Sequence, residues 1–78
     1  MSYNIIGILV RKPLVIGASL QKLLGSYGCI IRNRLGLNHK AIDGGLIILD
    51  LHGDKKQIEL FLVELSELEG IEHKQINF

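Results

Sequence analysis

Ile5-Ile6-Gly7-Ile8-Leu9-Val10 and Gly45-Leu46-Ile47-Ile48-Leu49 are two short stretches that read as strands and have no polar side chain. Successive side chains of a strand point to opposite faces of its sheet, so each stretch is apolar on both faces. A strand with one face in water would alternate apolar with polar residues. We therefore expect both stretches to be central strands of a sheet that is covered on both sides.

The rest of the chain predicts two helices and two edge strands. Apolar residues recur at helical spacing over residues 13–27, and again over residues 58–68 after Asp54, which is a suitable N-cap. Segments 29–37 and 71–78 have the mixed polarity of edge strands. In the first of these, simple alternation assigns one face to Ile31, Asn33, Leu35 and Leu37.

The predicted order of strand, helix, strand, strand, helix and strand is the ferredoxin-like βαββαβ arrangement of α+β proteins. In this fold both helices pack on one face of a four-stranded antiparallel sheet, and the first and third strands lie in its centre. Those are the two strands that the apolar stretches form. We therefore expect residues 1–78 to fold as a single domain of this type.

The two helices leave the second face of the predicted sheet uncovered. Because a contiguous apolar face is rare on a soluble monomer, we expect a second copy to cover it in a homo-dimer or tetramer. Alternation does not decide which face of the central strands packs on the helices. The side chains that meet a second copy could therefore be the set with Ile5 and Leu9. Our predicted oligomer interface uses the other set, which comprises Ile6, Ile8, Val10, Ile47 and Leu49.

Composition excludes several classes of protein. With 78 residues, of which 47% are hydrophobic and 22% are charged, the chain suits one folded domain and not a disordered tail. The net charge of +1 provides no field that would attract nucleic acid or an anionic membrane. A single cysteine excludes an internal disulfide, and no apolar run is long enough to span a bilayer. We expect a soluble cytoplasmic protein.

Side chains that could carry chemistry are few and lie far apart in the chain. His39, His52, His73 and Cys29 show none of the spacings of common metal sites. We therefore expect no cofactor, with a metal sensor built from these four residues as an alternative. Because Cys29 stands next to Ile30 at the start of a predicted strand, we expect it to be a buried thiol. No nucleophile or acid–base pair converges, so we predict no enzyme.

One enzyme family with this topology, the acylphosphatases, uses a glycine-rich phosphate cradle that contains an arginine after the first strand. The corresponding segment here, Arg11-Lys12-Pro13-Leu14, lacks the glycines, so an acylphosphatase-like hydrolase is the weaker alternative. A modest basic cluster accompanies the second strand and its loop, and it is suited to an anion or an acidic partner. The cluster comprises Arg32, Arg34, His39 and Lys40.

Five segments follow the pattern of a known family of small proteins. They are Leu23-Leu24-Gly25-Ser26-Tyr27-Gly28, Ile30-Ile31-Arg32-Asn33-Arg34-Leu35-Gly36-Leu37, Gly45-Leu46-Ile47-Ile48-Leu49-Asp50-Leu51, the predicted helix from Ile58 through Leu68, and Gly70-Ile71-Glu72-His73-Lys74. Within them, Arg34-Leu35-Gly36-Leu37 is the most specific piece. On these segments the chain resembles the iron-only hydrogenase system regulator family, whose members are ACT-like domains related in fold to the regulatory domain of the nickel-responsive repressor.

The resemblance implies an oligomeric regulatory or sensor module, such as a transcriptional or hydrogenase-system regulator, that acts through an effector or a protein partner. Effectors in such folds bind at subunit interfaces, near the first loop and helix start or near the central hairpin. Together with the basic cluster, this gives the expected effector-binding residues Arg11, Lys12, Gly17, Arg32, Arg34, Gly44 and Gly45. The repressor's nickel is held by three histidines and one cysteine, a count that this chain equals.

Overall fold

The computed structural model describes residues 4–11, 13–38 and 45–78. Its elements, in chain order, are β1 (Asn4–Val10), α1 (Pro13–Ser26), the short 3-10 helix η1 (Gly28–Ile30), β2 (Ile31–Asn38), β3 (Gly45–Leu51), α2 (Lys55–Ser66) and β4 (Ile71–Asn77). The four strands form one sheet in the order β2-β3-β1-β4, and every neighbouring pair is antiparallel. The predicted ferredoxin-like fold is confirmed, with β1 and β3 in the centre.

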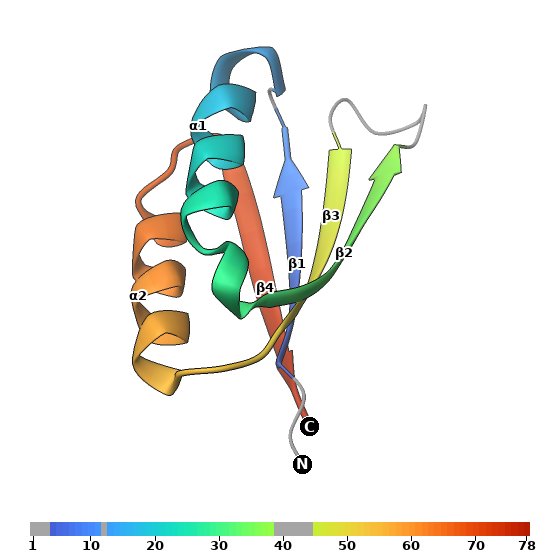
Figure 1. Cartoon of the computed structure of the whole chain (residues 1–78). Coiled ribbons are helices and arrows are strands. Elements are labelled where there is room, and N and C mark those ends of the chain that lie inside the picture. The colour runs from blue at the N-terminus through green and yellow to red at the C-terminus, as the bar shows by residue number, and fades with distance from the viewer. Residues whose placement is uncertain (1–3, 12, 39–44) are drawn as a thin grey trace.

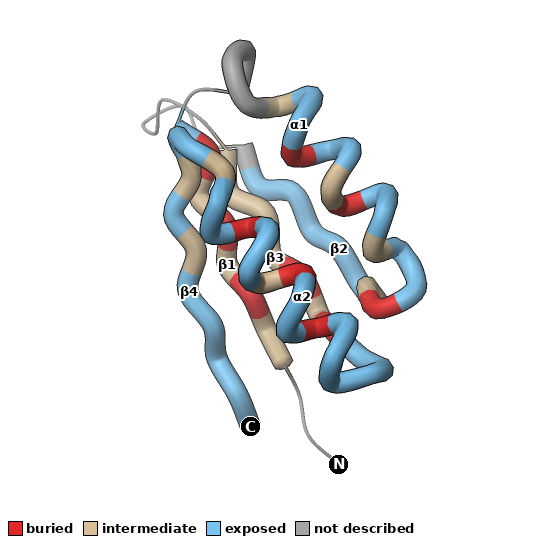
Figure 2. Tube along the Cα trace, turned by 90° about the vertical axis from the view of Figure 1, so that its left-hand side faces the viewer, coloured by how far each residue is buried: buried red, intermediate tan, exposed pale blue. Residues whose placement is uncertain are grey.

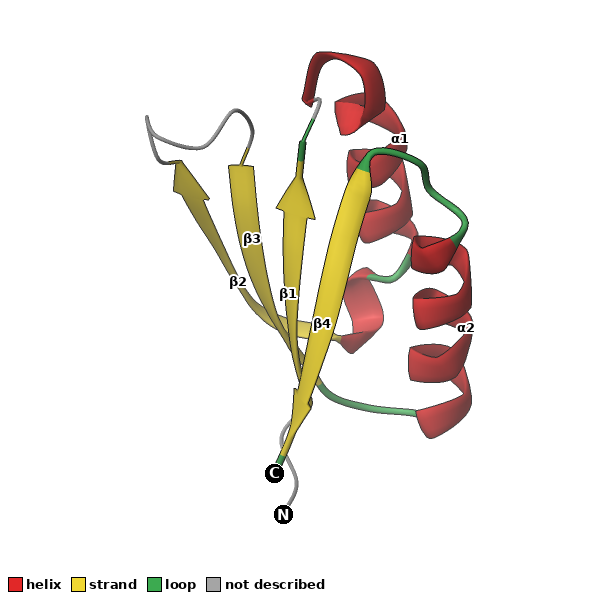
Figure 3. Ribbon diagram, turned by 180° about the vertical axis from the view of Figure 1, so that it is seen from behind, coloured by secondary structure: helices red, strands yellow, loops and turns green. Residues whose placement is uncertain are grey.

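Both helices lie on the same side of the sheet, as Figures 1 and 3 show from opposite directions. The core fills the space between the helices and the sheet, and both layers contribute buried residues to it (Figure 2). The apolar residues buried there are Ile6, Ile8, Val10, Leu20, Leu24, Ile30, Leu49, Leu51, Ile58, Phe61 and Leu65. No described helix has the length and apolar content needed to cross a membrane.

A cap at the start of α2 and contacts of Tyr27 with α2 hold the two helices in place. Asp54 caps α2, because its carboxylate accepts a hydrogen bond from the Lys56 amide at 3.1 Å. The Tyr27 ring packs against Phe61 with 5.3 Å between ring centroids, which joins the end of α1 to α2. The Tyr27 hydroxyl donates a hydrogen bond to the Glu64 carboxylate, and this bond is the main cause of the raised pKa of Tyr27.

The predicted oligomer interface is wrong, because it names the face of the sheet that the helices cover. Ile6, Ile8 and Leu49 expose none of their surface, and Val10 is also buried. Ile47 is half-buried and packs against the same core. Side chains that are already enclosed by α1 and α2 have little surface left for a second subunit. The alternative set, which contains Ile5 and Leu9, points away from the helices.

A β-bulge in β2 also overturns the expected faces of that strand. Ile31 pairs with Leu51 and Asn33 pairs with Asp50, so Arg32 is an extra residue with no partner of its own in β3. The extra residue shifts the alternation by one position. Ile31 therefore packs on the core beside Leu51, whereas the rest of the predicted set, Asn33, Leu35 and Leu37, faces the other way.

Replacing Phe61 by alanine should lower the free energy of unfolding by about 3–5 kcal/mol, because it removes a fully buried ring and leaves a cavity. Small domains have only about 5–15 kcal/mol to lose, so much of this variant should be unfolded at moderate urea. The neighbouring Leu60 is 52% exposed in the same helix and provides the control. Urea unfolding followed by circular dichroism should place Leu60→Ala within about 0.5 kcal/mol of the parent protein, and equal losses for both variants would contradict the packing.

Deleting Arg32 should leave the fold intact, because Ile31 and Asn33 then alternate regularly and keep their partners in β3. The matched control is deletion of Ile47 from β3, which pairs with β1 without a bulge and so has no extra residue to lose. That deletion turns part of a central strand over and should abolish cooperative unfolding. Amide proton spectra of the two deletion variants make the comparison, and loss of structure on deletion of Arg32 would contradict this role of the bulge.

Candidate functional site: the open sheet face

The face of the sheet opposite the helices is the strongest candidate for a functional surface, and we call it the open sheet face. Strand register places its side chains in three rows that each run across β2, β3, β1 and β4. The first row is Asn33, Asp50, Ile5 and Ile76. The second row is Leu35, Ile48, Gly7 and Lys74. The third row is Leu37, Leu46, Leu9 and Glu72.

Large apolar side chains dominate the open sheet face. Leu35 and Ile76 are each more than half exposed, and Leu37 is 44% exposed. Ile5, Leu9, Leu46 and Ile48 are half-buried, and they lie in neighbouring positions of the rows. None of the described elements covers this face, since both helices lie on the other side (Figure 3). Contiguous apolar surface of this kind marks an interaction site on a soluble protein.

A hollow lies near the middle of this face, where Gly7 of the central strand has no side chain. The hollow has a volume of about 260 Å³ and is lined by Gly7, Leu9, Leu46, Glu72, His73 and Lys74. A Cβ atom added at Gly7 would come to 3.8 Å from the Cδ1 atom of Ile48, which is ordinary van der Waals contact. Since the monomer has room for alanine there, the glycine is not required by packing within the chain. Glycine inside a strand is typical of places where another group approaches the backbone closely.

Polar side chains occupy two opposite corners of the open sheet face. At one corner, Asn33 Nδ2 donates a hydrogen bond to Asp50 Oδ2 at 3.0 Å. At the other, the Glu72 carboxylate is paired with the Arg11 guanidinium at 2.7 Å. Lys74 makes no ion pair with any residue that the structure describes. The face thus has a carboxylate at one corner and an unpaired cation near the other.

The residues predicted to bind an effector are not brought together. Arg11 follows Val10 at the end of the sheet where β3 begins with Gly45, whereas Arg32 lies at the bulge near the opposite end. Arg34 is on the helix side, where its Nη2 donates a hydrogen bond to Gln21 Oε1 at 2.8 Å. Gly17 is half-buried in α1. The remaining two, Lys12 and Gly44, lie outside the described residues.

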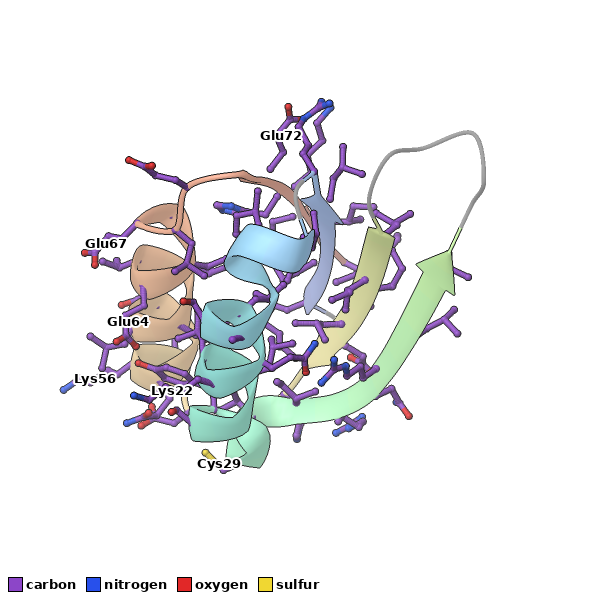
Figure 4. All side chains as sticks on the ribbon, turned by 90° about the horizontal axis from the view of Figure 1, so that it is seen from above. Lys22, Cys29, Lys56, Glu64, Glu67 and Glu72 are labelled. Carbon is purple, nitrogen blue, oxygen red and sulfur yellow. The ribbon has the colours of Figure 1, made fainter. Side chains whose placement is uncertain are left out.

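The predicted metal ligands are dispersed in the described part of the fold. Over residues 4–11, 13–38 and 45–78, no group of three His, Cys, Asp or Glu side chains is placed to hold a metal ion. His52 is exposed just after β3, and His73 is half-buried on β4. Cys29 is exposed in η1, so the expected buried thiol is wrong (Figure 4). His39 lies outside the described residues.

A second hollow opens between α2 and β4 on the helix side of the sheet. It has a volume of about 520 Å³ and is lined by Asn4, Gly53, Lys55, Ile58, Glu59, Leu62, Gln75 and Asn77. Three of its amide side chains bond to one another, because Gln75 Nε2 donates to Asn77 Oδ1 at 3.0 Å and to Asn4 Oδ1 at 3.4 Å. The amides therefore satisfy each other and hold the end of β4, and no buried polar atom of the described residues is left without a partner.

Comparison with known proteins relates the chain to others by fold. No protein-family model and no curated protein sequence matches it. The structure of the uncharacterized protein TM1266 from Thermotoga maritima superposes with a TM-score of 0.88 at 20% identity, over 100% of this chain and 99% of that one. CPII from Thiomonas intermedia, a nitrogen regulatory PII-like protein, has a TM-score of 0.64 at 10% identity, over 100% and 90% of the chains. SnoaB from Streptomyces nogalater, a cofactor-independent oxygenase, has a TM-score of 0.61 at 10% identity, over 96% and 90%.

These likenesses show a shared ferredoxin-like fold and a similarity to PII-like regulators at that level. The fold occurs in a regulator and in an oxygenase alike, so function has to be argued from surfaces. Sequence reasoning omitted Leu35, Leu37 and Ile76 from the interface. Once one face of β1 is known to be covered, strand register identifies all three.

Proposed function

We propose that this protein is a small regulatory module that acts by forming a homo-oligomer and by binding an effector or a protein partner, and not by catalysis. The observation that carries the proposal is the open sheet face, whose apolar side chains span all four strands. Burial of this surface in a second copy is favourable by about 25 cal/mol for each Å² removed from water.

Three further points support a regulatory role. Arg11, the arginine that an acylphosphatase-like site would require, is paired with Glu72. The sequence resembles the iron-only hydrogenase system regulators. The fold is similar to that of a nitrogen regulatory PII-like protein. We assign no effector, because the residues expected to bind one are spread over both ends of the sheet.

The proposal is tested by the mass of the protein in solution. Analytical ultracentrifugation from about 1 to 200 µM should show an oligomer that dissociates on dilution. Leu35→Lys places a charge in the middle row of the open sheet face and should weaken association at least about tenfold, because the ammonium group would lose its water in the interface. A monomer at every concentration would contradict the proposal.

Val63 provides a matched control for Leu35, because each is 55% exposed. Val63 lies on α2, whereas Leu35 lies on the opposite side of the sheet from the helices. Val63→Lys adds the same charge to the chain and should leave the association constant unchanged. If both variants dissociate equally, the interface does not lie on the open sheet face.

A further inference from the structure

The arrangement of side chains on the open sheet face indicates how two copies would pack. We infer that the two sheets face each other with their strands crossing at nearly right angles. Asp50 of each copy then meets the partner's Lys74, and Ile48 of each copy lies between the partner's Gly7 and Ile48, beside the hollow. This inference rests on the proposed homo-oligomer and specifies its geometry.

The three rows form a nearly square grid. Neighbouring strands lie about 4.8 Å apart, and residues two apart in one strand are separated by about 6.8 Å. Four strands and three rows therefore each span about 14 Å. Asn33 and Asp50 occupy one corner of the square, and Lys74 and Glu72 are at the diagonally opposite corner. Apolar Leu37 and Ile76 occupy the other two corners.

Two identical faces can pack through a two-fold axis that lies in the plane between them. Four such axes pass through the centre of the square, one along the strands, one across them and one along each diagonal. An axis along the strands sets Asp50 over the partner's Ile5, which buries a carboxylate against an apolar side chain. An axis across the strands sets each Lys74 over the partner's Lys74. An axis along the diagonal from Asn33 to Glu72 sets each Glu72 over the partner's Glu72. Each of these arrangements leaves like charges together or a charge without a partner.

The diagonal from Leu37 to Ile76 is the remaining axis, and it exchanges the two polar corners. Asp50 then lies close to the partner's Lys74, which makes no ion pair within the described part of its own chain. Glu72 comes to lie over the partner's Asn33, beside Asp50, with its charge already paired with Arg11 of its own chain. The same rotation places Ile48 between the partner's Gly7 and Ile48, where the missing side chain of Gly7 and the hollow of about 260 Å³ leave room for it. Rotation about a diagonal turns the strand direction by about 90°, which is one of the two usual ways in which sheets pack.

Charge exchange between two variants tests this geometry. Asp50→Lys and Lys74→Asp each place like charges together at both symmetric contacts, so each should weaken self-association at least about tenfold. The double variant restores opposite charges and should associate within about threefold of the parent protein. The two single variants mixed in equal amounts should form a heterodimer, because both contacts then join opposite charges.

Heterodimer formation can be followed by energy transfer between dyes on Cys29, which is the only cysteine in the chain, is exposed and lies in η1. A control pair makes the same two kinds of charge change on α2. Glu59→Lys replaces an acidic residue by lysine, Lys56→Asp replaces a lysine by aspartate, and both residues are exposed. Lys56 lies on the side of α2 away from the sheet (Figure 4). The control variants should keep the self-association of the parent protein and should show no preference for each other.

Gly7→Ala tests the hollow separately. The added methyl group fits the monomer, so the variant should keep its fold, and it partly fills the hollow that the partner's Ile48 would enter. We expect association to weaken about threefold to tenfold, with an unchanged amide spectrum. An unchanged dissociation constant would overturn the placement of Ile48.

The outcomes separate this inference from the proposal on which it rests. A parent protein that stays monomeric contradicts both. If Leu35→Lys dissociates the oligomer, but the single charge variants associate as the parent does and show no preference for the heterodimer, the crossed packing is overturned and the open-face association stands. A preference of the mixed single variants for the heterodimer over their homodimers, with only the statistical share of mixed dimers from the control pair, supports the crossed packing.

Discussion

Two helices can cover only one face of a four-stranded sheet, and most properties of this protein follow from that constraint. The central strands β1 and β3 are apolar on both faces, so each contributes to two hydrophobic surfaces at once. One surface forms the core with Phe61, Leu65, Leu20 and Leu24. The other has no partner among the described elements. The chain therefore folds around one layer of apolar side chains and presents a second to its surroundings.

Two small backbone features give the open sheet face its shape. The bulge at Arg32 lets Ile31 fill the core and still turns Leu35 and Leu37 toward the open side. If β2 alternated regularly through Arg32, without a bulge, both leucines would face the helices together with Ile31. Gly7 makes the second feature, because its missing side chain leaves a hollow in a central strand. The edge strand β2 thus supplies the exposed leucines of the open sheet face, and the central strand β1 supplies the hollow at Gly7.

The fold by itself is a poor guide to what the protein does. Structures that superpose on it include a nitrogen regulatory PII-like protein, an oxygenase and an uncharacterized protein, all at 20% identity or less. Chemistry on the surface is the better guide, and the open sheet face of this chain is an apolar square with Asp50 near one corner and Lys74 near the opposite one. Such a pattern favours association with a copy of itself, and this is the basis of the regulatory role that we propose.

The sequence alone determined the order of the elements, the N-cap at Asp54 and the central position of β1 and β3. These features depend on local spacing and on short apolar runs, which can be read from neighbouring residues. It did not determine which face of the sheet the helices cover, because an apolar run such as Ile5 to Val10 is the same from both sides. The bulge at Arg32 depends on pairing with β3, so alternation within β2 could not reveal it. Only the tertiary structure decided both, because the face that packs on α1 and α2 is chosen by contacts between residues far apart in the chain.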